Sequence, residues 1–191
     1  MSTDAIVMLR DDHKQIRKLI RAYRAAESGR SSTRGDGQHG DGQRGAPGTR
    51  HTAADPAAKA EAVDELLHLL SVHTHIEDEV MYPRVRQLVP QTGETVLEFH
   101  EEHHVADVLA RELEGMDPAD EAFDAKAKVL MEAVERHMEA EEGAWFPEVR
   151  RSVGRKELQA IGARMAEARE RAPQRPQRSL LKKLAHALTP V

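Results

Sequence analysis

The sequence predicts an all-α protein, an up-and-down four-helix bundle with a fifth, C-terminal helix. Three observations support this fold class. Ala, Leu, Glu, Arg and Lys, which favour helices, dominate the composition, and only 3% of the 191 residues are aromatic, fewer than sheet proteins usually contain. Apolar residues recur at intervals of three and four, as on one face of a helix. Two stretches of the chain also repeat each other.

Breaks in the apolar pattern divide the chain into helices. Pro56 is suited to a first helical turn, Gly93 follows a break that begins at Pro90, and Asp117-Pro118 opens the fourth segment. The helices are expected over residues 4–27, 56–88, 94–116, 117–152 and 156–171.

Pro83 and Pro147 lie toward the ends of the second and fourth segments. A proline inside a helix lacks an N–H donor, and its ring clashes with the carbonyl four residues earlier. We therefore expect these two prolines to kink or end their helices.

Residues 28–55 differ from the rest, since Gly, Ser, Arg, Gln, Asp and Thr leave almost nothing to bury. Such a segment cannot offset the entropy cost of ordering and is expected to be a disordered insert. The expected organisation is a bundle over 1–152 that contains this insert, an additional helix over 153–172 that packs on the bundle, and a Pro-containing linker with a short basic amphipathic tail over 173–191.

The composition excludes several classes of function. The chain has no cysteine, which removes disulfides, thiolate nucleophiles, iron–sulfur clusters and thiolate zinc sites. A net charge of −5 in mixed patches argues against nucleic-acid binding. There is no run long enough for a transmembrane segment, and the charged N-terminus does not resemble a signal peptide. We expect a cytoplasmic protein, and the sequence does not identify a protein partner.

The repeat carries most of the functional information. HTHIEDEVMYPRVR begins at His73 and HMEAEEGAWFPEVR at His137, and both contain H-x-x-x-E followed by aromatic-Pro-x-Val-Arg. DDH ends at His13 and EEH at His103. The interval within the first pair exceeds that within the second by 26 residues (60 against 34), about the length of the insert. The chain is thus predicted to be two copies of one helical hairpin, paired about a pseudo-twofold axis.

Polar residues interrupt the apolar face of each of the four bundle helices. Residues three and four apart share a helix face, so these polar side chains are expected in the core. Burying a carboxylate without a partner costs several kcal/mol of folding free energy, and a bound cation would offset this cost. The predicted metal ligands are His13, His73, Glu77, His103, His137 and Glu141.

Two assignments have rivals. His75 and Glu79 repeat the H-x-x-x-E spacing, but the apolar residues of that helix centre near His73. His75 is therefore expected beside the ligands or at the surface, with an accessory ligand as the alternative. His104 forms an H-x-x-x-H pair with His100, whereas the match between EEH and DDH favours His103 over His104.

Imidazole with carboxylate suits iron, zinc, manganese or copper better than calcium or magnesium. Six ligands in a twofold arrangement indicate two ions, since a mononuclear zinc site uses three or four. If both carboxylates bridge, coordination positions remain open to solvent or to a small molecule.

At DDHKQIRKLI, HTHIEDEVMYP, EEHHVADVL and HMEAEEGAWFP the sequence resembles the hemerythrin-like HHE cation-binding family, over residues 4 to 172 without the insert. It looks closest to the bacterial subgroup with the ligand order His, His-x-x-x-Glu, His, His-x-x-x-Glu. The resemblance implies a non-haem di-iron centre, bridged by carboxylate and by an oxo or hydroxo group, on the six residues above. Oxygen-carrying hemerythrins differ, with H-x-x-x-H on the third helix and a later Asp on the fourth.

The function expected from this resemblance is binding of hydrogen peroxide, dioxygen or nitric oxide at the di-iron site, with catalase-like peroxide breakdown as the enzymatic form. No catalytic acid or base is identified, and Glu102, His75 and His104 are the candidates. One alternative is a sensing or binding module for oxygen, nitric oxide or iron without catalysis. Another is a bundle whose His/Glu core is structural and holds zinc or no metal.

Overall fold

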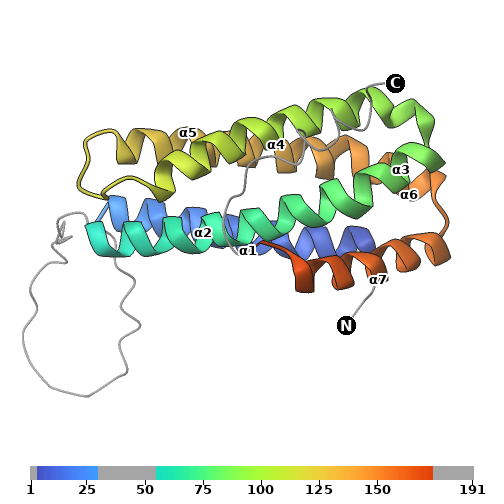
Figure 1. The fold of residues 1–191 in the computed structure, drawn as a ribbon, viewed down its shortest axis with the longest axis horizontal. Helices are drawn as coiled ribbons and strands as arrows, with labels where there is room; N and C mark the ends of the chain where they lie inside the picture. The colour runs from blue at the N-terminus through green and yellow to red at the C-terminus, as the bar shows by residue number, and fades with distance from the viewer. Residues whose placement is uncertain (1–3, 30–54, 174–191) are drawn as a thin grey trace, which may run out of the picture.

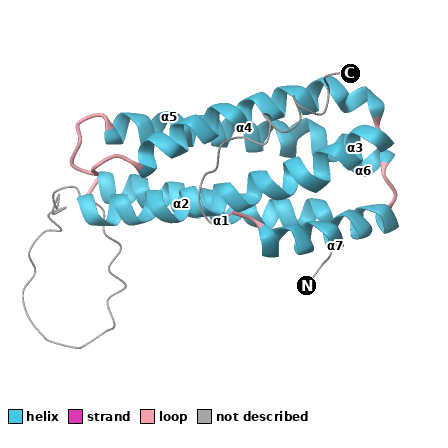
Figure 2. Ribbon diagram, viewed as in Figure 1, coloured by secondary structure: helices cyan, strands magenta, loops and turns pink. Residues whose placement is uncertain are grey.

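The computed structural model describes residues 4–29 and 55–173, and every regular element in these ranges is helical (Figure 2). Four long helical segments run up and down side by side, and α7 lies along one side of this bundle (Figure 1). The predicted fold class is confirmed. The predictions of a disordered insert and a basic tail fall mostly on residues outside the described ranges. No helix within those ranges combines the length and apolar character needed to cross a membrane.

The elements follow the predicted order. The first hairpin pairs α1 with a long second segment, and the second hairpin pairs α4 with another long segment. A five-residue π-helical turn interrupts each of the two long segments. The bounds are α1 (Ala5–Glu27), α2 (Pro56–Ile76), η1 (Glu77–Met81), α3 (Tyr82–Leu88), η2 (Pro90–Thr92), α4 (Gly93–Glu114), α5 (Phe123–Ala140), η3 (Glu141–Trp145), α6 (Phe146–Ser152) and α7 (Arg155–Arg171).

Side-chain caps fix the starts of the first two helices. Asp4 accepts a hydrogen bond from the Val7 amide at 3.2 Å, and Asp55 accepts one from the Ala58 amide at 3.1 Å. Each cap satisfies an amide that has no partner within its helix. The Asp55 amide also donates to the Ala26 carbonyl at 3.1 Å, so the end of α1 and the start of α2 lie in direct contact.

The fourth bundle helix begins later than the sequence predicts. Residues 117–122 form turns, and α5 starts at Phe123. The Asp117 carboxylate accepts from the Ala119 amide at 2.9 Å, and Asp120 accepts from the Ala122 amide at 2.8 Å. Such local bonds compete with helical hydrogen bonding, which explains the delayed start.

The two prolines do not end their helices. Pro83 and Pro147 each lie just past a π-helical turn, and the chain remains helical to Leu88 and Ser152. The widened turn bonds the amide before each proline to a carbonyl five residues earlier. This spacing moves the proline ring away from the carbonyl with which it would clash in a regular α-helix.

Two apolar clusters fill the interior, one toward each end of the bundle. One gathers Met81, Tyr82, Phe99, Trp145 and Phe146 together with the buried face of α7. The other surrounds Ile16, Ile20, Tyr23, Leu66 and Leu130. Neither cluster includes the predicted metal ligands, which form a polar layer of the core.

The contact between the ends of α1 and α2 predicts that the intervening residues are dispensable for folding. Replacing residues 31–53 by a short Gly/Ser linker should leave the fold intact and raise the free energy of unfolding by about 1 kcal/mol, because a shorter loop costs less entropy to close. Thermal unfolding of the shortened and full-length chains measures this. A shortened chain that unfolds many degrees earlier would contradict it.

Candidate metal centre

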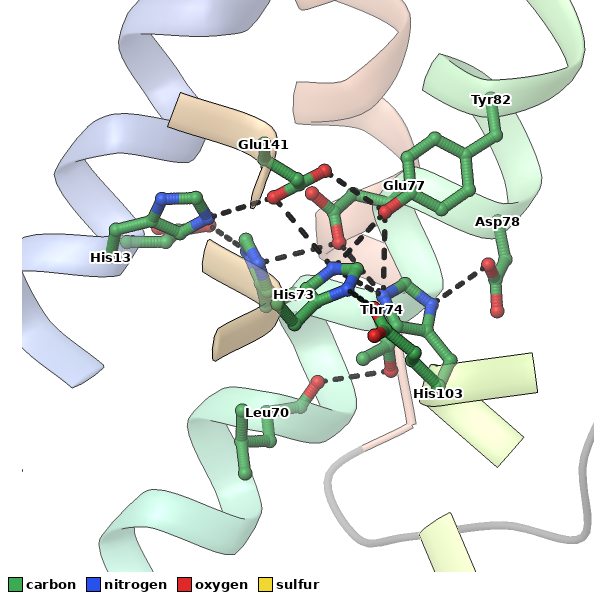
Figure 3. Close-up of polar contacts among 12 residues, drawn as sticks. His13, Leu70, His73, Thr74, Glu77, Asp78, Tyr82, His103 and Glu141 are labelled. Carbon is green, nitrogen blue, oxygen red and sulfur yellow. Dashed lines mark hydrogen bonds and ion pairs between the residues drawn. The ribbon is translucent and has the colours of Figure 1, made fainter. Parts of the chain in front are cut away.

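All six predicted ligands are buried at one level of the bundle. His13 lies on α1, His73 on α2, His103 on α4 and His137 on α5, while the two glutamates open the π-helical turns η1 and η3. Their exposures are 0% for His13, Glu77 and Glu141, 2% for His73, 4% for His103 and 6% for His137. Figure 3 shows five of them with their side chains turned toward one another.

The six side chains form two groups that share Glu77. Half-centre 1 is His13, His73, Glu77 and Glu141, and half-centre 2 is Glu77, His103 and His137. Within each group, one donor atom from every residue lies within 4.8 Å of the others. The Nε2 atoms of His73 and His103 lie 3.3 and 3.4 Å from Oε2 of Glu77, which therefore stands between the two groups.

Glu141 links the halves from the other side. Its Oε2 lies 3.2 Å from Nε2 of His13 and 3.7 Å from Nε2 of His137. Both glutamates thus occupy the positions in which a carboxylate could contact two metal ions.

Each histidine of hairpin one turns its other ring nitrogen to an outer carboxylate. His13 Nδ1 lies 2.6 Å from Glu142 Oε1, and His73 Nδ1 lies 3.4 Å from Asp12 Oδ2. Arg17 donates to Glu142 at 2.8 Å. These carboxylates orient the rings as they commonly do behind metal-bound histidines.

Hairpin two repeats this arrangement. His103 Nδ1 lies 3.0 Å from Asp78, and His137 Nδ1 lies 2.7 Å from Glu102. The pairing is the same in both hairpins. The acid that follows Glu77 or Glu141 in the sequence faces the histidine on the first helix of the opposite hairpin. The acid that precedes His13 or His103 in the sequence faces the H-x-x-x-E histidine of the same hairpin.

The outer carboxylates fix the histidine tautomers. An ionised carboxylate can only accept, so each Nδ1 carries the proton, and each ring in its neutral form directs the Nε2 lone pair into the centre. The Nε2 atoms of His103 and His137 are only 3.1 Å apart. Two lone pairs and two carboxylates facing one another repel, and a cation between them, whether a proton or a metal, removes that repulsion.

Several inward atoms have no hydrogen-bond partner among the described residues. They are Nε2 of His13, Nε2 of His73, both carboxylate oxygens of Glu77 and Oε2 of Glu141. An unpaired buried polar group costs about 1–3 kcal/mol, and more when it is charged. The donor set and its unsatisfied atoms therefore fit metal ions.

The pKa values reflect the crowding of acids. Burial, together with the charges of Glu141 and Asp78, raises the pKa of Glu77 well above its ordinary value. Burial would also raise the pKa of Glu141, but His13, 3.2 Å from its Oε2, and His137 lower it overall, because protonation of either ring stabilises the carboxylate. Burial lowers the pKa of His73 to about 4, which keeps this ring neutral at pH 7.

One pair of repeated positions makes the halves different. Tyr82 and Phe146 are the aromatic residues of the two repeats. The Tyr82 hydroxyl donates to Glu141 Oε1 at 2.9 Å and lies 3.4 and 3.3 Å from Nε2 of His103 and of His137. Phe146 stacks on His13 with the ring centres 5.7 Å apart and offers no polar atom. Half-centre 2 therefore has an extra hydroxyl that half-centre 1 lacks.

A small cavity adjoins half-centre 2 between α2, α4 and α5. Its volume is about 20 Å³, enough for one water-sized molecule. The lining combines three centre histidines with Glu102, Thr74 and apolar side chains: Leu70, His73, Thr74, Glu102, His103, Ala106, Ala133, Val134, His137 and Met138.

The rival residues lie outside both groups. His75 pairs with Glu79 at 2.9 Å on another face of the helix. His100 Nδ1 contacts Asp78 at 2.9 Å, and His104 belongs to neither half-centre. The structure therefore turns His103, not His104, into the centre.

Sequence reasoning missed four residues around the centre, namely Asp12, Asp78, Glu142 and Tyr82. Glu102 was considered only as an acid or base, whereas here it accepts from His137. The repeat contained the signal, because acids occupy matching positions beside His13 and His103 and after Glu77 and Glu141.

Two comparisons with individual proteins add to this picture. A solved structure titled as a hemerythrin HHE cation binding domain-containing protein, the Rv2633c homolog from Mycobacterium kansasii, superposes with a TM-score of 0.60 over 95% of this chain and 92% of its own, at 20% identity. A Nostoc sp. protein named DNA nickase is 25% identical over 121 residues, or 63% of this chain. The match spans about a third (34%) of that longer protein.

The family model described as the hemerythrin HHE cation binding domain matches residues 4–149. That range contains α1, α2, α4 and α5 and all six buried His and Glu residues. The chain therefore belongs to the hemerythrin HHE cation binding domain family and forms a metal-binding helical domain.

Proposed function

We propose that this chain is a non-haem di-iron protein that binds a small oxidant (hydrogen peroxide, dioxygen or nitric oxide) beside half-centre 2, with catalase-like breakdown of peroxide as its reaction. The observation that carries the proposal is the pair of adjoining His/Glu groups with unsatisfied inward atoms. In it, His13, His73, Glu77, His103, His137 and Glu141 are the metal ligands, the two glutamates serving both ions.

Nitrogen and oxygen donors support iron as the occupant. A set of four imidazoles and two carboxylates without thiolate suits iron in a bundle core. An iron pair, if bound, would give two electrons to one molecule of peroxide, which becomes two of water, and take two back from a second molecule, which becomes dioxygen.

The size and lining of the cavity support a small ligand. A volume of about 20 Å³ admits a molecule of a few atoms and excludes organic substrates. The lining includes both histidines of half-centre 2. The cavity adjoins that same half.

Residues around the centre would orient the metal ligands and exclude water from the site. The outer carboxylates hold the four imidazoles in one tautomer, and the apolar clusters on either side keep bulk solvent away. The Tyr82 hydroxyl donates a hydrogen bond to Glu141 at 2.9 Å and lies beside the two histidines of half-centre 2.

One observation favours a second candidate, a binding or sensing module without catalysis. Two of the candidate acid–base groups are engaged elsewhere, Glu102 with His137 and His75 with Glu79. Peroxide breakdown by the iron-loaded chain distinguishes the candidates. The name of the Nostoc relative belongs to a longer protein, of which this chain matches about a third (34%).

The first prediction concerns metal content. The wild-type chain, loaded anaerobically with ferrous iron and desalted, should retain two iron ions. His73→Ala should retain one or none, because half-centre 1 loses a donor. His75→Ala is the matched control, since it removes a histidine of the rival pair, and it should retain two. Iron analysis against protein concentration measures this, and equal iron in both variants would refute the ligand assignment.

The second prediction concerns peroxide. Iron-loaded wild type should evolve one dioxygen for every two peroxide molecules consumed, and His75→Ala should match its rate. His73→Ala should evolve oxygen at least tenfold more slowly, because iron in half-centre 2 alone cannot deliver both electrons. An oxygen electrode measures the rates. No oxygen from wild type that holds two irons would favour the binding module.

The third prediction concerns pH and the metal-free chain. Since the pKa of Glu77 is raised in the folded state, its contribution to stability is present below the ordinary carboxyl pKa and is lost as pH rises through the raised one. At pH 7, metal-free Glu77→Gln should therefore unfold at a higher temperature than metal-free wild type, by roughly 2–4 °C for each kcal/mol gained.

The advantage of Glu77→Gln should vanish at pH 4, where the wild-type carboxyl is protonated. Iron should reverse the order at pH 7, because free metal at 100 times its Kd adds about 2.7 kcal/mol to the chain that binds it. Glu79→Gln, which changes a partly exposed neighbour, is the control. An unchanged melting temperature for metal-free Glu77→Gln at pH 7 would show that this carboxyl carries no such cost.

A further inference from the structure

Helix α7 reaches the metal centre through Arg169. Its Nη2 and Nη1 donate to the two carboxylate oxygens of Asp12 at 2.6 and 3.1 Å. The Asp12 side chain is only 4% exposed, and its Oδ2 also lies 3.4 Å from Nδ1 of His73. A chain of three side chains therefore connects α7 to half-centre 1.

The equivalent acid in the other half has no such connection. Glu102 precedes His103 as Asp12 precedes His13, and it accepts from His137 at 2.7 Å. Its side chain is 33% exposed, and the guanidinium that approaches it, that of Arg136, is 3.9 Å away and 69% exposed. The link through α7 is thus particular to one half of the centre.

The rest of α7 also packs near half-centre 1. Its buried face is Leu158, Ile161, Gly162, Met165 and Ala168, which packs on the apolar cluster below the centre. Near its start, Glu157 pairs with Arg84 at 2.6 Å. Near its end, Arg171 lies 3.4 Å from Glu79, two residues after Glu77 in η1. The C-terminal end of α7 therefore contacts residues adjacent to the inner side chains of half-centre 1.

We propose that Arg169 is a positioning residue that couples the docking of α7 to metal occupancy of half-centre 1. The inference depends on the part of the proposed function that places two metal ions in the centre. It does not depend on the oxidant or on catalysis.

The coupling follows from how His73 is held. Without metal, Nε2 of His73 has no hydrogen-bond partner, and the long contact with Asp12 holds the ring at Nδ1. A cation on Nε2 would fix the ring and strengthen the Nδ1–H as a donor. Asp12 can accept that bond only in the place where Arg169 holds it, so metal binding and docking of α7 favour each other.

Charge alone would act in the opposite direction. A guanidinium near the centre repels a metal cation, but Arg169 forms a two-bond pair with Asp12 whose net charge is zero. The Arg169–Asp12 pair therefore acts mainly by holding Asp12 where it can accept from His73. Coupling between two sites is reciprocal, so the effect can be measured from either end.

The first experiment measures affinity. Full-length wild type, Arg169→Met and Arg164→Met are titrated with ferrous iron under anaerobic conditions, Arg164 being an exposed arginine of the same helix. In Arg169→Met, one of the two ions should bind about 10–100-fold more weakly and the other unchanged. Arg164→Met should match wild type. A general loss of stability would weaken both ions, and two ions at wild-type affinity in Arg169→Met would overturn the proposal.

The second experiment measures docking by hydrogen exchange of α7 amides in wild type, with and without two ferrous ions. Loading should slow exchange near Arg169 by about fivefold or more, and Arg169→Met should lose this response. Unchanged exchange in a wild type that holds two ions would overturn the proposal even if the variant fails to fold. A wild type that binds no iron would instead overturn the proposed function, and this inference with it.

Discussion

The fold depends on one constraint, which is that a layer of hydrogen-bond acceptors is enclosed by apolar residues. Four imidazole lone pairs and two carboxylates face one another at 3.1–3.7 Å with almost no exposure. Water cannot enter in bulk to separate them, and the described side chains supply few donors apart from the Tyr82 hydroxyl. The bundle is therefore organised around sites for cations, and the outer carboxylates, the π-helical turns and α7 can each be understood from that requirement.

Much of this arrangement could be predicted because the chain repeats itself. A single H-x-x-x-E at His73 would have meant little, but its second copy at His137 fixes which face of each helix turns inward. The same register selects His73 over His75 and His103 over His104, and the structure places both selected side chains in the core. Helix periodicity gives the fold class for the same reason, since four apolar faces interrupted at one level can be buried together in only a few ways.

The details that escaped prediction depend on contacts between distant parts of the chain. Pro83 follows a π-helical turn, and Met81 and Tyr82 are buried there in an apolar cluster that also contains residues of α4 and α7. No local sequence pattern reports such a contact. The partners of the outer acids are similarly remote, as Glu142 lies 129 residues from His13. Nothing in the sequence singles out Arg169, because the acid it meets, Asp12, lies 157 residues away.

The two halves of the centre are related by sequence but differ in what balances their outer carboxylates. Arg17 and Arg169 give Glu142 and Asp12 permanent positive partners. In the other half Asp78 contacts His100, and Glu102 is partly exposed to water. The arginines hold the outer carboxylates of half-centre 1 in place, whereas half-centre 2 adjoins the cavity and the Tyr82 hydroxyl. If two ions bind as proposed, each half-centre would hold one, and the differences outside the duplicated ligands would favour a firmly held ion in half-centre 1 and ligand access at half-centre 2.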